Sequence, residues 1–294
     1  MLYCYTSYPR TTSWKEDKHC CSWDGVQCDK NTGHVIGLDL SCSRLKGAIH
    51  SNCTLFLLRH LRSLNLAGNY FHYSLNSSEF GQFKSLTHLN LSHSFFTGQV
   101  LSQISQLSSL VSLNLSYTDM SSIRPKSLMN PSSSLTTLSL CSCFLRGKLE
   151  NSILLLPSLQ TLDLRSNPSL NVSLPSNWSS SSLKFLYLSK IRFSGEILDS
   201  IGNLKSLKHL YLVDCNFSGS IPTLLGNLTQ ITGLILSWNN FTESIPTLLG
   251  NLTQLTYLDL SANKFSGVIP AWLGNLTNLT FLYLSSNSFN GEIQ

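Results

Sequence analysis

Residues 255–278 read LTYLDLSANKFSGVIPAWLGNLTN, and this 24-residue stretch contains every position of a unit that recurs along the chain. The core of the unit is Leu-x-x-Leu-x-Leu-x-x-Asn, and Cys or Ser replaces Asn in some copies. The central leucines of eleven copies are Leu38, Leu64, Leu89, Leu113, Leu138, Leu162, Leu186, Leu210, Leu234, Leu258 and Leu282. They are spaced by 24 to 26 residues, and eleven copies in register cannot arise by chance.

This period and pattern predict a leucine-rich-repeat solenoid. Leu258-Asp259-Leu260 alternates between buried and exposed positions, which indicates a strand. Successive units place these strands side by side, while Asn263 forms a hydrogen-bonded ladder and the following AWLGNL stretch makes a helical turn. We therefore predict an α/β fold, a right-handed leucine-rich-repeat solenoid with a concave parallel β-sheet. Each unit buries its leucines against its neighbours.

The cysteines divide the chain into a cap and a repeat array. Six of the nine fall within the first 53 residues, at Cys4, Cys20, Cys21, Cys28, Cys42 and Cys53. This clustering predicts a cysteine-containing N-terminal cap at residues 1–34 that covers the edge of the first repeat, followed by repeats over residues 35–294. Cys143 and Cys215 replace the ladder asparagine and are interpreted as structural, and Cys42 could pair with Cys53.

The ends of the chain and two irregular stretches give further expectations. The start has no apolar signal region. The longest purely apolar run, 153–156, is far too short to span a membrane. The eleventh repeat stops at Gln294 without a polar cap. We therefore expect a fragment whose signal peptide and membrane anchor lie outside it, and fraying of the last repeat. The less regular stretches 124–134 and 167–182 predict longer surface loops.

The opening stretch and the repeat type together carry a family resemblance. Trp14, Cys20, Cys21, Trp23, Gly25, Val26 and Cys28 match a cap motif, and GSIP, ESIP and GVIP recur at 219–222, 243–246 and 267–270. Cap and repeats resemble the extracellular region of plant leucine-rich-repeat receptor-like proteins of the disease-resistance type. The resemblance implies plant-specific 24-residue repeats and an N-terminal disulfide cap. It covers essentially the whole chain.

The resemblance also implies a function. Such proteins lie on the extracellular side of the plasma membrane, are glycosylated, and signal in immunity or development through a co-receptor kinase after binding a peptide or protein. Two alternatives remain, a secreted inhibitor of microbial wall-degrading enzymes similar to polygalacturonase inhibitors, and the ectodomain of a receptor kinase. Within the cap, Cys21–Cys28 closes a short loop and is the favoured disulfide, since adjacent cysteines rarely pair; Cys4–Cys20 is a second candidate.

Composition and motifs exclude other classes of function. Charged residues make up only 12% of the chain and the net charge of +5 is scattered, which disfavours nucleic-acid binding. We find none of the usual catalytic motifs and expect no enzyme and no cofactor. A zinc site at His19, Cys20, Cys21 and Cys28 is disfavoured against disulfides, because adjacent cysteines are poor joint ligands.

Asn-x-Ser/Thr sequons mark twelve candidate glycosylation sites, although part of this pattern is repeat consensus. They are Asn52, Asn76, Asn90, Asn114, Asn171, Asn177, Asn216, Asn227, Asn240, Asn251, Asn275 and Asn278.

The candidate ligand-binding surface lies on the concave face of the later repeats. Early repeats carry small polar residues between the strand leucines, such as Asn65 and Asn114, whereas later repeats carry aromatic and charged residues. Exposed aromatic residues on a rigid sheet are typical of a binding surface, although strand propensity also favours them. The predicted site is Phe185, Tyr187, Lys190, His209, Tyr211, Asp214, Trp238, Tyr257, Asp259, Phe281 and Tyr283.

Overall fold

Each repeat contributes one short strand that is centred on its middle leucine. The computed structural model describes residues 4, 8–72, 78–96, 103–122, 134–175, 178, 182–194 and 198–290. It forms two compact units, Met1–Arg146 and Gly147–Gln294. In both units the strands pair in parallel with the central leucines in register, so the predicted leucine-rich-repeat solenoid is confirmed. The predicted boundary between cap and repeats after residue 34 stays a prediction.

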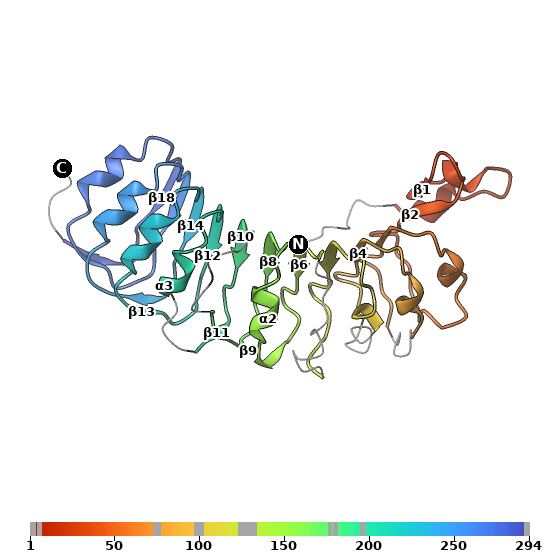
Figure 1. Cartoon of the computed structure of the whole chain (residues 1–294), viewed down its shortest axis with the longest axis horizontal. Coiled ribbons are helices and arrows are strands. Elements are labelled where there is room, and N and C mark those ends of the chain that lie inside the picture. The colour runs from red at the N-terminus through yellow and green to blue at the C-terminus, as the bar shows by residue number, and fades with distance from the viewer. Residues whose placement is uncertain are drawn as a thin grey trace. The chain divides into compact units, whose positions relative to one another are not determined.

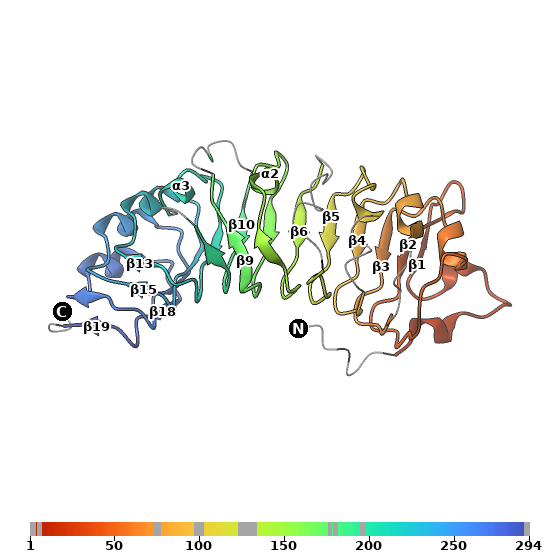
Figure 2. The ribbon, with the colours of Figure 1, turned by 90° about the horizontal axis from the view of Figure 1, so that it is seen from below.

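The first unit holds a sheet whose strands follow the order of the sequence (Figure 2). Its strands are β1 (Val26–Cys28), β2 (Val35–Asp39), β3 (Ser63–Asn65), β4 (His88–Asn90), β5 (Ser112–Asn114) and β6 (Thr137–Ser139). β1 belongs to the predicted cap and pairs antiparallel with β2. It thereby occupies the edge of the first repeat strand, which would otherwise expose unpaired backbone groups.

The second unit holds the later strands in the same parallel arrangement (Figure 1). They are β8 (Thr161–Asp163), β10 (Phe185–Tyr187), β12 (His209–Tyr211), β14 (Gly233–Ile235), β16 (Tyr257–Asp259) and β18 (Phe281–Tyr283). Their central leucines are at most 1% exposed from Leu162 to Leu258, whereas Leu282 in β18 is 42% exposed. The neighbouring repeat is therefore what buries each strand leucine.

Short helices and small secondary sheets complete the repeats. In Figure 1 the helices of the second unit step along one side of it, with the main strands on the other. The first unit has η1 (Arg10–Ser13), η2 (Cys20–Ser22), η3 (Thr54–Leu57) and η4 (Ser78–Gln82). The second has α2 (Asn151–Leu154), α3 (Leu198–Ile201), η6 (Thr223–Asn227), η7 (Thr247–Asn251) and η8 (Ala271–Asn275). The secondary strands are β7 (Arg146–Lys148), β9 (Ser169–Val172), β11 (Arg192–Phe193), β13 (Ser218–Gly219), β15 (Asn240–Phe241), β17 (Ser266–Gly267) and β19 (Ser288–Phe289).

Proline sets the start of the helical turns in the regular repeats. Pro222, Pro246 and Pro270 each precede η6, η7 or η8, with φ between -59° and -68°. The pyrrolidine ring fixes φ in this range, and proline lacks the N–H that would need a partner at a helix start. In the Ile-Pro dipeptides at 221–222 and 245–246, the isoleucine is buried in the core and the proline begins the helical turn.

The ladder predicted from the sequence runs through the turns that follow the strands. Asn239 donates from Nδ2 to the carbonyl oxygens of Leu212 and Leu236, at 2.7 Å and 2.9 Å. Its Oδ1 accepts from the backbone N–H groups of Cys215 and Phe217, at 3.0 Å and 3.1 Å. One side chain thus satisfies backbone groups of two successive repeats, which buried turns require.

The structural role predicted for Cys143 and Cys215 is confirmed. Both are buried, and each thiol donates to the carbonyl oxygen that a ladder asparagine would reach, Leu115 at 3.1 Å for Cys143 and Leu188 at 3.3 Å for Cys215. Burial raises the pKa of the Cys143 thiol to about 11 and that of Cys215 to about 12. Both therefore remain thiols at neutral pH.

A left-handed backbone conformation recurs at the residue just before the ladder position. His93, Tyr117, Lys190, Asp214 and Trp238 all have φ between 53° and 63° there. This conformation costs most residues about 1 kcal/mol. The hydrogen bonds of the ladder and of the sheet must therefore stabilise it. The side chain at this position lies in the turn, beyond the end of the strand.

The cap disulfides agree with only part of the sequence prediction. Cys21 is joined to Cys28, the favoured pair. The Cys4–Cys20 candidate is wrong, because Cys4 is joined to Cys42, across 38 residues of sequence. That bond also excludes the Cys42–Cys53 pair, and Cys20 and Cys53 are free thiols. Sequence spacing gave no sign that the N-terminal segment returns to the turn after β2.

The second irregular stretch is more ordered than a surface loop. Residues 169–172 form β9, and the backbone N–H of Leu149 donates to the carbonyl oxygen of Asn171. Trp178 is 1% exposed, and its indole N–H donates to the carbonyl oxygen of Leu154 at 2.8 Å. The prediction of a surface loop at 167–182 is therefore wrong for its described residues. Most of the first stretch, 123–133, lies outside the described residues.

Candidate functional site

The solvent-facing side of the sheet in the second unit carries two rows of side chains, one on each side of the leucine row. Parallel pairing places Phe185, His209, Gly233, Tyr257 and Phe281 in one row. The same pairing places Tyr187, Tyr211, Ile235, Asp259 and Tyr283 in the other. Strand positions two residues apart face the same side, and therefore the two rows form one surface.

Four predicted residues form a contiguous aromatic cluster on β10 and β12. The ring centroids of Phe185 and His209 lie 5.0 Å apart in an edge-to-face arrangement. The rings of Tyr187 and Tyr211 lie 4.8 Å apart, and the Tyr187 hydroxyl is 3.2 Å from His209 Nδ1. All four side chains are half-buried, so each ring packs against its neighbours and still faces solvent. We call these four residues the β10–β12 cluster.

Arg165 extends the β10–β12 cluster and was not predicted. Its guanidinium carbon lies 5.0 Å from the centroid of the Tyr187 ring, within cation–π range. The same guanidinium pairs with Asp163, at 2.7 Å between Nη2 and Oδ2 and 2.9 Å between Nε and Oδ1. Asp163 pairs in register with Tyr187, and Arg165 lies two residues further along the chain, just after the second strand leucine, Leu164. Strand alternation does not extend to this position, and so the sequence pattern gave no signal for Arg165.

A second aromatic group lies on β16 and β18. The Tyr257 ring lies 5.6 Å from the rings of both Phe281 and Tyr283. Between the two groups, β14 offers Gly233 and Ile235, and a Cβ atom at 233 would be in ordinary contact with the rings of His209 and Tyr211. Gly233 therefore adds no side chain to the row beside the β10–β12 cluster.

The other four predicted residues occupy two kinds of position. Lys190, Asp214 and Trp238 occupy the left-handed turn position, and Trp238 is 68% exposed. Asp259 lies in the strand row, but its Oδ1 accepts from the backbone N–H of Ser261 at 2.9 Å and from the Ser261 hydroxyl at 2.6 Å. Asp259 therefore caps its own turn, and the part that Trp238 plays in ligand binding stays a prediction.

Burial adjusts the protonation of the β10–β12 cluster. Burial lowers the pKa of His209, and the nearby Lys208 lowers it further. Burial also raises the pKa of Tyr187. At neutral pH His209 is thus mainly neutral and Tyr187 keeps its proton, which suits the Tyr187 hydroxyl as donor to the imidazole. The cluster thus presents aromatic area that is uncharged at neutral pH.

The predicted glycosylation asparagines fall into three groups. Asn52, Asn216, Asn227, Asn251, Asn275 and Asn278 are exposed, Asn90, Asn114, Asn171 and Asn240 are half-buried, and Asn76 and Asn177 lie outside the described residues. In the second group, Asn90 Oδ1 accepts from the backbone N–H of Ser92 at 3.1 Å, and Asn114 Oδ1 accepts from that of Ser116 at 3.0 Å. Both asparagines therefore stabilise their turns whether or not a sugar is attached.

Sequence comparisons identify relatives of the chain. A family model described as leucine rich repeat matches residues 229–289, and a related one matches 85–107, 182–204 and 206–228. Receptor-like protein 6 of Arabidopsis thaliana is 40% identical over 233 residues, which cover 68% of this chain and 23% of that protein. Receptor-like protein Cf-9 of Solanum pimpinellifolium is 42% identical over 242 residues, covering 69% and 28%. The chain thus spans about a quarter of these relatives' length.

Solved structures agree on the fold. The PEPR1–AtPEP1 crystal structure matches with a TM-score of 0.68 and 30% identity, covering 97% of this chain and 47% of that one. A leucine-rich-repeat protein of Leptospira interrogans also matches, with a TM-score of 0.64 and 28% identity, covering 86% and 67%. Because a bacterial protein shares the fold, function must be argued from the surface of this chain. Over the described residues, none of the helices has the length and apolar character that crossing a membrane requires.

Proposed function

Because the chain belongs to the plant leucine-rich-repeat receptor-like proteins, we propose that it forms part of a ligand-binding ectodomain in immune or developmental signalling. The ligand in this proposal is a peptide or protein, and the chain itself is non-catalytic. PEPR1, whose fold this chain shares, has a crystal structure with AtPEP1, which supports a ligand of this kind. The whole protein would lie on the extracellular side of the plasma membrane and act with a co-receptor kinase.

The observation that carries the proposal is the β10–β12 cluster. Rigid aromatic rings that pack on one another lose little conformational entropy when a ligand covers them, and such residues dominate binding energies. Phe185, Tyr187, His209 and Tyr211 meet this description, and Arg165 adds a cation at their border. The early repeats carry Asn65, Asn90 and Asn114 in the equivalent row, which lack this apolar area.

The strand geometry favours an extended ligand that crosses the strands. Strands in a sheet lie about 4.8 Å apart, so the span from β10 to β18 is roughly 20 Å. An extended peptide of about six residues, at roughly 3.3 Å each, covers that length. Its apolar side chains would pack on the β10–β12 cluster and on Tyr257, which lie on either side of Gly233 in the strand row.

Panning a displayed random peptide library against the secreted protein tests the proposal. Recovered peptides are synthesised and their dissociation constants are measured against variants. Tyr187→Ala and Tyr211→Ala should each weaken binding by about 2 kcal/mol, roughly 30-fold, as expected of hot-spot residues. Trp238→Ala should have a smaller effect, since Trp238 lies in the turn.

Asn65→Ala is the control in the early repeats and should leave binding unchanged. Circular dichroism must show that every variant is folded. If the recovered peptides bind the Tyr187→Ala and Tyr211→Ala variants as tightly as the parent, the ligand site lies elsewhere and the proposal fails.

A further inference from the structure

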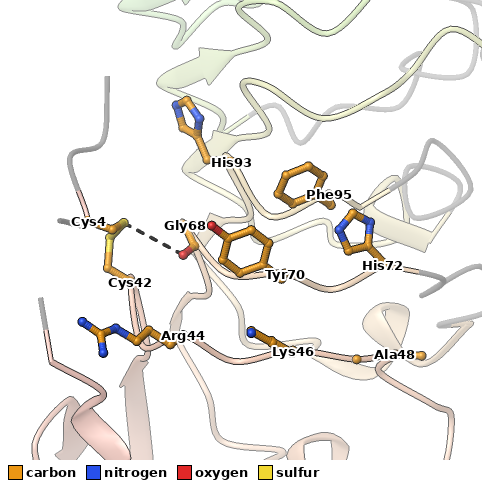
Figure 3. A pocket seen from close by; sticks show the side chains of 11 residues that line it. Cys4, Cys42, Arg44, Lys46, Ala48, Gly68, Tyr70, His72, His93 and Phe95 are labelled. Atoms are coloured by element: carbon orange, nitrogen blue, oxygen red, sulfur yellow. Dashed lines mark hydrogen bonds between the residues drawn. A yellow bond between two sulfur atoms is a disulfide. The ribbon is translucent and has the colours of Figure 1, made fainter.

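A pocket in the first unit lies outside the strand face and is formed by three successive turns. Segments 42–48, 68–72 and 93–95 line it, together with Cys4 (Figure 3). Its volume is about 1070 Å³. We call it the turn pocket. Ligand pockets are usually about 300–1,000 Å³, so this one is large enough for several residues of a peptide.

Aromatic rings form one wall of the turn pocket. Tyr70 and Phe95 are 47% and 49% exposed, and their ring centroids lie 5.4 Å apart with an angle of 18° between the planes. The His72 ring lies 4.4 Å from that of Phe95. In Figure 3 these three rings lie together on the two upper turns. Rings that a soluble protein holds in contact at its surface are typical of an interaction site.

The opposite end of the turn pocket is rigid. The Cys4–Cys42 disulfide packs on Gly68, where a Cβ atom would lie 2.6 Å from Cys4 Sγ and 2.9 Å from Cys42 Sγ. Gly68 also has φ of +71°, a conformation that glycine adopts without strain. A parallel bridge joins Lys46 to Tyr70 and fixes the first turn to the second. The pocket is therefore preformed, which lowers the entropic cost of binding.

The charge on the lining is positive. Arg44 and Lys46 both contribute to it, and the described residues of the lining include no aspartate or glutamate. Within the described part of the chain, neither cation is paired with a carboxylate. His72 and His93 also line the pocket and add positive charge only when protonated. The pocket thus combines aromatic area with two cations that no carboxylate of the described residues neutralises.

We propose that the turn pocket binds an acidic peptide segment, whose carboxylates pair with Arg44 and Lys46 and whose apolar or aromatic side chain packs on Tyr70 and Phe95. Charge complementarity selects the anion, since arginine and lysine bind carboxylates by charge-assisted hydrogen bonds. The aromatic wall favours a peptide over a small inorganic anion. Such an anion would pair with Arg44 and Lys46 but would leave the rings of Tyr70 and Phe95 exposed to solvent. Aromatic residues with arginine are also the composition of protein-binding surfaces. This proposal is independent of the strand-face site.

A synthetic peptide series provides the test. The probe is an octapeptide that alternates aspartate with tryptophan. Two matched peptides replace either aspartate by asparagine or tryptophan by serine. The probe should bind the secreted protein more tightly than both. Raising the ionic strength from about 0.05 M to about 0.5 M should weaken its binding, because exposed charge pairs are screened.

Single substitutions then assign the site. Arg44→Gln and Lys46→Gln should each weaken probe binding about tenfold, the lower end of the effect of a charged hydrogen bond. Phe95→Asn should weaken it by a similar factor, and asparagine tolerates the left-handed backbone at 95, where φ is 58°. Phe144→Asn is the matched control, since Phe144 is 61% exposed with φ of 56° but does not line the pocket.

The outcomes separate the alternatives. Equal binding of the aspartate and asparagine peptides, or equal losses from Phe95→Asn and Phe144→Asn, would overturn the proposal. Binding of a uronic acid oligosaccharide through the same residues, without binding of the peptide probe, would reject the peptide as occupant. Melting temperatures near that of the parent exclude unfolding as the cause. Tyr211→Ala should leave probe binding unchanged, which distinguishes failure here from failure of the strand-face site.

Discussion

Replacing Asn239 by alanine tests how much of the stability depends on the ladder. Asn239 is 7% exposed and makes side-chain hydrogen bonds to backbone groups of two repeats. In the alanine variant, the N–H groups of Cys215 and Phe217 and the carbonyl oxygen of Leu212 lose their partner. The described residues offer these three groups no second partner. The carbonyl oxygen of Leu236 keeps a hydrogen bond from Asn263 Nδ2 at 3.0 Å.

The size of the effect follows from these three groups. A buried polar group without a partner costs roughly 1–3 kcal/mol. Relaxation and water entry reduce the sum, and we expect Asn239→Ala to lower the free energy of unfolding by about 3–6 kcal/mol. Asn239→Cys should lower the free energy of unfolding less. At the equivalent position 215, a cysteine thiol already donates to the carbonyl oxygen of Leu188 at 3.3 Å.

Urea unfolding and hydrogen exchange provide the assay. Repeats contact only their neighbours, so protection should be lost over residues 212–241 and kept near the N-terminal disulfides. Asn240→Ala is the adjacent control, since among the described residues the half-buried Asn240 side chain bonds Asn216 alone, with Nδ2 donating to Oδ1 at 3.0 Å. A loss below about 1 kcal/mol for Asn239→Ala would refute the assignment of the ladder as a major source of stability.

Three further predictions concern single positions. Gly68→Ala should lower the melting temperature and hinder formation of the Cys4–Cys42 disulfide, as measured by non-reducing peptide mapping, because the added Cβ atom would overlap both sulfur atoms. The Cys215 thiol, whose pKa burial raises to about 12, should resist alkylation at pH 8 in the native protein and react after unfolding, so native labelling would contradict its burial. Burial lowers the pKa of His209, so the unfolded state binds a proton more readily than the folded state. The free energy of unfolding should therefore fall as the pH drops below about 6.5. In thermal melts between pH 8 and pH 5, a His209→Gln variant should show a weaker fall.

Periodicity predicted the parts of the fold that repeat. Each unit needs the same kind of side chain at the same position. The sequence can therefore predict the buried strand leucines, the ladder asparagines and the inward packing of Phe265. The Cys4–Cys42 bond could not be predicted, since sequence spacing contains no information on which distant segments return to one place. Strand β9 was missed because its stretch lacks the leucine pattern, although Leu170 and Val172 are buried.

The candidate site was predicted only where strand alternation holds. Alternation placed Tyr187 and Tyr211 correctly on one surface, but it ends at the second strand leucine. Trp238 lies two residues beyond that leucine, at the left-handed position with φ of 58°, where strand alternation no longer predicts which side a residue faces. The turn pocket was missed for the same reason. Its aromatic residues, Tyr70 and Phe95, follow the ladder position and have no periodic signature.

The recurring left-handed residue before the ladder has a consequence for how such a chain can diversify. Gly68, His93, Asp214, Trp238 and Ala262 occupy equivalent places with φ between 52° and 71°, so side chains of every size and charge are accepted on one backbone. The conformation is held by hydrogen bonds of other residues, which offset a strain of about 1–2 kcal/mol for most non-glycine side chains and less for asparagine and aspartate. Mutations at this position can therefore change the chemistry of the turn edge while leaving the repeat intact. Duplication of a repeat would add one more such position, and selection could then act on recognition with little interference from folding.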